Sequence, residues 1–211
     1  MIVEVCFMSP KTISGMSNNG NDFPFVIEGS APNNVVDFLF DDADPFQVVP
    51  AWMVNINRFP IYIYVEIFEF QKDKFEQLCN AHNIEYETLN IKNKRDGAYK
   101  ATVKNNQSFN AIFPYLYSTG SMNNVALWSL EKDVFSLGKR EFKTIFGKRK
   151  LHTPIVSLED NSSVFWVGFD GQHITAISNS KLFSSAEHIS NHFPLTISIL
   201  PAGNEVGEIH N

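Results

Sequence analysis

The chain has 211 residues, of which 44% are hydrophobic and 19% are charged, and its formal net charge is −6. This balance excludes an intrinsically disordered chain, and the length suffices for one large domain or two small ones. The sequence holds no run near the roughly 20 apolar residues of a membrane helix, so we expect no membrane partner.

The first residues, MIVEVCFMSP, carry no basic segment ahead of their apolar run, so they predict a strand and not an export signal. Only two cysteines occur, Cys6 and Cys79, and their spacing is not that of a metal-binding pair. Few cysteines and no export signal indicate the reducing cytoplasm. We expect neither a metal nor another cofactor.

The stretch FDDADPF at residues 40–46 follows the apolar run VVDFLF, which predicts a strand. Carboxylates at the end of a strand can hold a divalent cation, so Asp41, Asp42 and Asp44 are candidate metal ligands. The sequence offers no Gly-rich phosphate loop nearby and marks no further ligand downstream. A solvated acidic turn that begins at Asp44 and Pro45 is therefore the favoured interpretation.

Residues 61–91 predict a strand, a helix and a second strand. IYIYVEIFEF alternates aliphatic residues with aromatic and acidic ones, as a strand does with its aliphatic face in the core. KDKFEQLCNAHN predicts a helix that Asp73 caps and Asn83 ends, and IEYETLNI predicts the second strand. The helix should cover the aliphatic face of the sheet. Cys79 and His82 share one face of this helix, but a core cysteine is favoured over a nucleophile with its base.

Two polar segments follow. The segment STGSMNN at residues 118–124 predicts a turn, because it lacks the lysine and the spacing of a phosphate-binding loop. The basic run GKREFKTIFGKRK at residues 138–150 can bind nucleic acid or another polyanion, because its cations neutralise phosphates. Phe142 and Phe146 can stack on unpaired bases or, alternatively, anchor a short helix to the core. The candidate polyanion-binding residues are Lys139, Arg140, Lys143, Lys148, Arg149 and Lys150.

Residues 162–200 repeat the order of strand, helix and strand. Asp170 and Gly171 lie between two β-forming runs and predict a hairpin with a two-residue turn. SSAEHISNHFP then predicts a short helix that Ser184 caps, and LTISIL predicts a late strand.

Histidines gather in the C-terminal half of the chain. His188 and His192 are one helical turn apart and can bind zinc, with His173 and His210 as further histidines in this half. The sequence marks no third ligand, and histidines near the end of a helix also favour the helix dipole. A structural role is therefore favoured over a zinc site.

The predicted fold class is α+β and β-rich, with mainly antiparallel sheet and two or three short helices packed on one face. The similar order of elements in the two halves suggests two similar lobes, an acidic one at residues 1–106 and one at residues 107–211 that holds the basic run. The alternative is a single domain over residues 1–200.

The separation of charge guides the functional expectation. Residues 1–70 hold nine acids against two cations, whereas residues 138–150 are basic. We therefore expect a non-enzymatic binding or regulatory protein of the adaptor, immunity or inhibitor type, whose protein partner docks at Asp41, Asp42 and Asp44. One alternative is a metal-dependent hydrolase or transferase that uses these aspartates or the C-terminal histidines. The other is a nucleic-acid or polyanion binder, which the negative total charge makes less favoured. The sequence indicates no oligomeric state.

Overall fold

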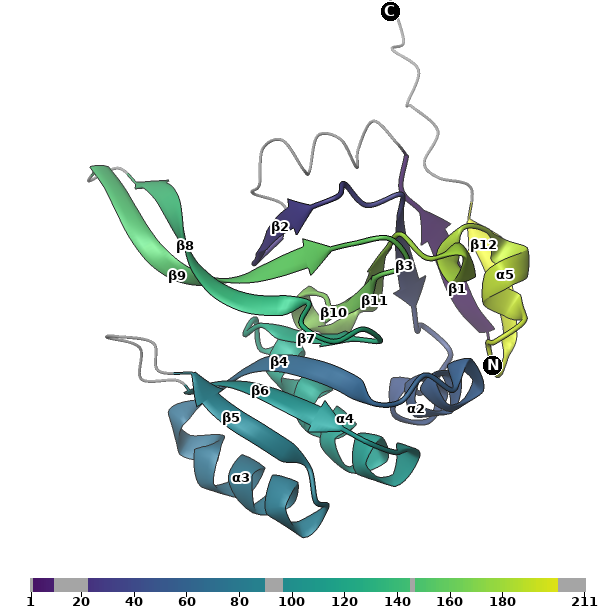
Figure 1. Ribbon diagram of the computed structural model, residues 1–211. Coiled ribbons are helices and arrows are strands. Elements are labelled where there is room, and N and C mark those ends of the chain that lie inside the picture. The colour runs from purple at the N-terminus through teal and green to yellow at the C-terminus, as the bar shows by residue number, and fades with distance from the viewer. Residues whose placement is uncertain (1, 10–22, 90–96, 145–146, 201–211) are drawn as a thin grey trace, which may run out of the picture.

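The computed structural model describes residues 2–9, 23–89, 97–144 and 147–200. Its fold is α+β, with mostly antiparallel sheets and short helices, as the sequence predicts. A nine-stranded sheet has the order β12-β1-β3-β11-β10-β7-β4-β6-β5, and a three-stranded sheet has the order β2-β9-β8. The two sheets and the helices are shown in Figure 1.

All pairings in the nine-stranded sheet are antiparallel except the one between β1 and β12. In the smaller sheet β8 pairs antiparallel and β2 pairs parallel with β9. The strands are β1 (Ile2–Phe7), β2 (Val26–Gly29), β3 (Asn34–Leu39), β4 (Ile61–Ile67), β5 (Glu85–Leu89), β6 (Gly97–Val103), β7 (Ala126–Ser129), β8 (Phe135–Thr144), β9 (Gly147–Leu158), β10 (Ser163–Val167), β11 (His173–Ser178) and β12 (Thr196–Leu200). The helices are α2 (Pro45–Ile56), α3 (Lys72–Ala81), α4 (Asn106–Ser121) and α5 (Ala186–Ser190), with short 3-10 turns η1 (Glu69–Gln71), η2 (Phe169–Gly171) and η3 (Lys181–Phe183).

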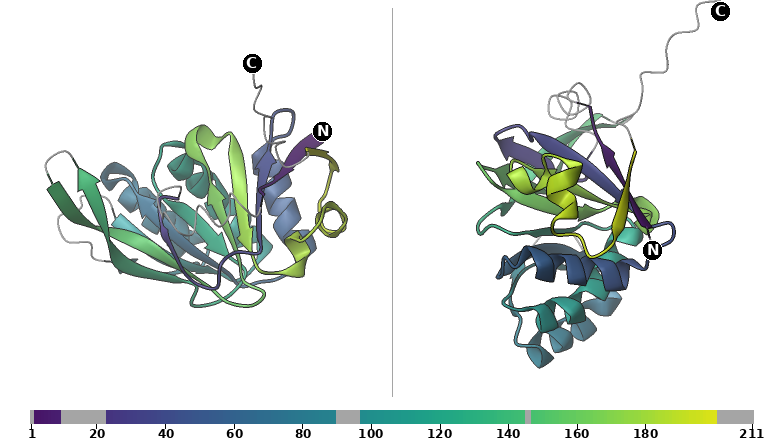
Figure 2. Two further views of the ribbon diagram at one scale, coloured as in Figure 1. Left: turned by 90° about the horizontal axis from the view of Figure 1, so that it is seen from above. Right: turned by 90° about the vertical axis from the view of Figure 1, so that its right-hand side faces the viewer.

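The central strands β4, β7 and β10 of the nine-stranded sheet are buried on both faces, except at the half-buried Tyr62. Ile63 and Val65 of β4 point into the larger core, which helices α2, α3 and α4 cover from below in Figure 1. Tyr64 points to the opposite face, where Phe135 and Val156 from the three-stranded sheet complete a second core. The right-hand view of Figure 2 shows α2, α3 and α4 on one side of the sheet and β2 on the other. The alternating side chains of β4 therefore pack into two cores, one on each face of the sheet.

The predicted strand, helix and strand over residues 61–91 are confirmed as β4, α3 and β5. Phe75 and Cys79 of α3 are fully buried in the larger core, so this helix covers the aliphatic face of the sheet. The predicted cap is wrong, because α3 begins after Gln71 without a side-chain cap and Asp73 lies in its first turn. Asn83 follows the helix at a φ of 52°. The last residues of the predicted second strand, 90–91, lie outside the described residues.

The predicted hairpin forms between β10 and β11, but its connection is longer than predicted. Residues 168–172 join the strands, with Gly168 N–H donating to the His173 carbonyl. Asp170 and Gly171 have φ angles of 57° and 65°, so both adopt the left-handed conformation for which these residue types are favoured. The helix that follows begins one residue later than predicted, since Ser185 is the residue whose hydroxyl accepts the cap hydrogen bond.

Two helices of the structure are not among the predicted elements. Helix α2 begins at Pro45, with Asp44 as its N-cap, and contains Pro50. Helix α4 begins after Asn105, whose side chain accepts from Ser108 N–H, and its last turn occupies residues 118–121. The predicted turn over residues 118–124 therefore starts as a helix and becomes a turn only at its end.

The larger sheet contains strands from both sides of residue 106, and strands of one half lie between strands of the other. β11 pairs with β3, and β7 pairs with β4. The division into lobes at residue 106 stays a prediction.

Candidate functional site

The acidic stretch at residues 41–44 joins strand β3 to helix α2. Asp41 and Asp42 are exposed, whereas the following Ala43 is buried in the larger core. Asp44 Oδ1 accepts a hydrogen bond of 3.0 Å from Phe46 N–H and caps the helix. Of the three predicted site residues, Asp44 therefore stabilises the start of α2, whereas the carboxylates of Asp41 and Asp42 face solvent.

The turn between β10 and β11 lies beside this acidic loop. Leu39, the last residue of β3, pairs with His173, the first residue of β11, so the two loops leave the same end of the sheet. Tyr117 of α4 connects them, because its ring packs against Phe46 at a centroid distance of 4.9 Å and its hydroxyl donates to the Gly171 carbonyl. Burial first, and then the Asp44 carboxylate, raise the pKa of Tyr117, so the hydroxyl stays protonated as a donor.

Asp170 is exposed in the same turn and adds a fourth carboxylate to this end of the sheet. We call Asp41, Asp42, Asp44 and Asp170 the acidic corner. The sequence did not indicate that Asp170 joins the group, because the pairing of β3 with β11 connects residues more than a hundred positions apart.

An uncharged groove of about 500 Å³, lined by apolar and amide side chains, runs along the outer side of helices α2 and α4 and reaches the acidic corner at the start of α2. Phe46 and Val54 of α2 are 46% and 38% exposed there. None of the twelve residues of α2 is charged, and no lining residue of the groove is charged. The lining residues are Phe46, Gln47, Pro50, Ala51, Val54, Asn55, Asn106 and Asn110.

This outer face differs from that of an ordinary surface helix, which carries charged side chains toward water. The inner side of α2 is fully engaged, since Trp52 and Met53 are buried in the larger core. The core therefore holds the helix in place, while apolar and amide groups remain at its surface. Such surfaces are typical of interaction sites.

The basic run forms most of a long hairpin of β8 and β9. The alternative of a short helix anchored by Phe142 and Phe146 is wrong, because residues 135–144 and 147–158 are strands, with residues 145–146 outside the described part. Lys139 and Lys150 are exposed. Lys143 pairs with Lys148, and Phe142 pairs with Arg149.

Arg140 lies at the base of this hairpin. Its Nη1 donates a hydrogen bond of 3.2 Å to the carbonyl of Phe23, and the side chain is half-buried. This cation therefore helps to tie the hairpin to the segment that precedes β2.

Cys79 and His82 have structural surroundings. Burial first, and then the nearby Glu76 carboxylate, raise the pKa of Cys79 to about 12, so the thiol is neutral at physiological pH. The His82 carbonyl at the end of α3 accepts a hydrogen bond from Ser108 Oγ of α4. The hydrogen bond between Ser108 and the His82 carbonyl ties α4 to the end of α3, and a neutral Cys79 is not an activated nucleophile.

The C-terminal histidines do not share a helical face. Helix α5 ends at Ser190, so His192 lies beyond it. His188 Nδ1 is 2.8 Å from Ser184 Oγ and 3.2 Å from Ser185 Oγ. In the described part of the chain, no group of three His, Cys, Asp or Glu side chains has the arrangement of a metal site. His210 lies outside the described residues.

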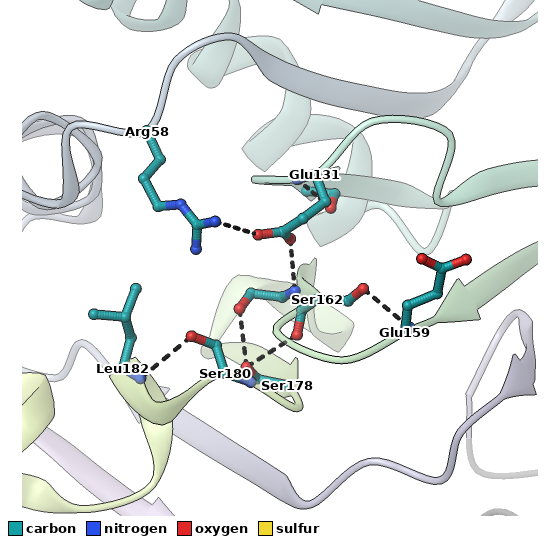
Figure 3. A network of polar contacts seen from close by, with 9 residues as sticks. Arg58, Glu131, Glu159, Ser162, Ser178, Ser180 and Leu182 are labelled. Atoms are coloured by element: carbon teal, nitrogen blue, oxygen red, sulfur yellow. Dashed lines mark hydrogen bonds and ion pairs between the residues drawn. The ribbon is translucent and has the colours of Figure 1, made fainter.

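Figure 3 shows a polar network at the opposite end of β10, which the sequence did not predict. Glu131 Oε2 accepts from Ser163 N–H at 2.8 Å, and Glu131 Oε1 forms an ion pair of 3.1 Å with Arg58 Nη2. Ser178 Oγ is 2.9 Å from Ser163 Oγ and accepts from Ser180 N–H. Burial raises the pKa of Glu131, and the Ser163 N–H and Arg58 lower it.

These serines bond to backbone groups or to one another, so none is paired with a base that would activate it. The network closes the ends of β7, β10 and β11. We interpret it as structural.

A second polar cluster lies on the face of the sheet opposite to α2. Thr175 Oγ1 donates to Asp37 Oδ1 at 2.6 Å, and Cys6 occupies the neighbouring position on β1. Burial is the main cause that raises the pKa of Asp37, whereas Thr175 and His173 lower it. Burial and Asp37 also raise the pKa of Cys6. A thiol held neutral in this way is a poor nucleophile.

A smaller cleft of about 330 Å³ lies between strands β4, β5 and β6 and the start of β8. Its charges are mixed, with Lys100 and Glu87 paired at 3.6 Å and with Lys132 next to Asp133. Three carboxylates and two ammonium groups line it, so its lining favours no single sign of ligand charge.

Within the described residues, none of the helices combines the length and the apolar character needed to cross a bilayer. Comparisons with protein-family models, with curated proteins and with solved structures found no match to this chain.

Proposed function

We propose that the protein is a non-enzymatic binding protein, and that its partner is a protein segment that joins an apolar anchor to basic residues. The observation that carries this proposal is the uncharged outer face of α2, on which Phe46 and Val54 are exposed and whose first turn adjoins the acidic corner. Apolar anchors in a groove supply most of the binding energy of an interface, whereas charges at its rim set orientation and association rate.

The proposed partner follows from these two parts. One aliphatic or aromatic side chain enters the groove between Phe46 and Val54, and lysines or arginines of the same segment face Asp41 and Asp42. The net charge of −6 adds a long-range attraction for a basic partner. Asp44 contributes less directly, because one of its oxygens caps α2.

A peptide-display selection tests this proposal, because it samples many partner sequences at once. Peptides are selected on the native protein and counter-selected on Val54→Glu, which places a charge in the groove. The matched control is Met122→Glu, because Met122 is 44% exposed and lies outside the groove. We expect selected peptides to combine an apolar anchor with Lys or Arg, to bind Val54→Glu about tenfold more weakly, and to bind Met122→Glu normally.

The charge component is tested with the variant Asp41→Asn/Asp42→Asn/Asp44→Asn, since asparagine also caps helices and keeps α2 intact. The association rate of a selected peptide at low salt should fall about tenfold, with a smaller change in dissociation rate. Peptides without basic residues, or an unchanged association rate, would contradict the proposal.

A further inference from the structure

The hairpin of β8 and β9 projects from the body of the protein as an arm. Its base is held, because β2 pairs with residues 155–158 of β9 and Thr153 Oγ1 donates to the Pro24 carbonyl. From the pair of Leu137 and Pro154 outward, the two strands pair only with each other in the described part of the chain. Figure 1 and the left view of Figure 2 show this ribbon extending beyond the larger sheet.

The arm concentrates positive charge. Residues 138–150 contain six cations and one carboxylate, which is a net charge of +5. Because the net charge of the whole chain is −6, all other residues together carry −11. Two exposed lysines of the arm, Lys139 and Lys150, lie on different strands. The ribbon is therefore net positive, whereas the rest of the chain is net negative, with 11 cations against 22 acids.

The register sets which charged residues of the arm share a face. Lys139 pairs with His152, and Glu141 pairs with Lys150. Because residues 139 and 141 are two positions apart on β8, Lys139 and Lys150 lie diagonally on the same face of the ribbon. The two exposed lysines therefore present their charge to one side of the arm.

We propose that the arm binds double-stranded DNA. A two-stranded β-ribbon fits the major groove of B-form DNA, whereas the deep, narrow major groove of double-stranded RNA does not admit it. Lysines on both edges of the ribbon then reach phosphates on both sides of the groove. The duplex repels the negative body, which favours an approach through the arm.

Fluorescence anisotropy with a labelled duplex DNA, a duplex RNA of the same sequence and single-stranded DNA tests this proposal. The test variant is Lys139→Gln/Lys150→Gln. The matched control is Lys132→Gln/Lys181→Gln, which removes the same charge from exposed lysines of the body. Each phosphate contact contributes about −0.9 to the slope of log affinity against log salt concentration, so the test variant should lose about 2 units of slope.

We expect the native protein to prefer duplex DNA, the control to keep the native slope, and Lys139→Arg/Lys150→Arg to restore binding because it keeps the charge. Equal affinity for duplex RNA or single strands, equal loss of slope in the control, or no binding at low salt would each overturn the proposal. The groove variant Val54→Glu should bind duplex DNA as the native protein does, so failure of the peptide-binding proposal is distinguishable from failure of this one.

Discussion

Replacement of Gly171 tests the geometry of the turn between β10 and β11. Its φ is +65°, and an added Cβ would lie 2.3 Å from Ser121 Oγ of α4. The left-handed backbone costs a residue with a side chain about 1–2 kcal/mol, and crowding in a packed region costs about 1–3 kcal/mol. We therefore expect Gly171→Ala to lower the free energy of unfolding by about 2–5 kcal/mol, which corresponds to about 4–20 °C in Tm.

A double-mutant cycle with Ser121→Ala separates the two causes. Without Ser121 Oγ, the nearest atoms to the new Cβ are Ser121 Cβ and Tyr117 Cε1, both at 3.2 Å. The cost of Gly171→Ala measured by urea unfolding should then fall to the backbone component of about 1–2 kcal/mol. A single variant within about 0.5 kcal/mol of the native protein would refute the turn geometry. Equal costs in both backgrounds would refute the close approach of Ser121.

Three further variants test other parts of the molecule. The pKa of Asp37 in the folded protein lies above its ordinary value of 3.8. The free energy of unfolding therefore falls as the pH rises from 3.8 through the folded pKa, because the fold disfavours the ionised carboxylate. Asp37→Asn keeps an acceptor for Thr175 and should be more stable than the native protein near neutral pH, with the difference vanishing toward acidic pH in urea unfolding series. Trp52→Ala should lose about 3–5 kcal/mol in the same assay, because Trp52 is 1% exposed and packs against four aromatic rings. Glu131→Ala leaves Ser163 N–H without its acceptor and should cost about 1–3 kcal/mol, whereas Glu131→Gln, which retains an acceptor, should cost less.

Local patterns predicted the elements whose periodicity is unambiguous. The alternation in β4 and the buried positions Phe75 and Cys79 of α3 follow periods of two and of about 3.6, and the structure confirms both. Helix α2 escaped prediction because Pro50 lies inside it and its outer face is apolar, so neither the usual composition nor the usual amphipathic pattern is present. Pro114 similarly obscured α4.

The candidate site depended on contacts that the sequence does not encode locally. The exposed Asp41 and Asp42 were visible in the sequence, but the groove arises because α2 packs beside α4 and presents Phe46 and Val54 to solvent. The contact of Tyr117 with the Gly171 carbonyl joins segments 54 positions apart. Such proximity is decided by the order of strands, and short sequence patterns carry little information about that order.

The strand order has a consequence for the way the protein emerges from the ribosome. β1 and β3 precede most of the other strands in the chain, yet their neighbours in the sheet include β12 and β11, which are synthesised well after them. Val36 and Phe38 of β3 are fully buried in the finished protein. Their strand pairs with residues 173–178, so it is enclosed only after those residues have been synthesised. The apolar strands β1 and β3 therefore need β12 and β11 to complete their pairing in the sheet. A nascent chain that stops before residue 173 would leave them exposed.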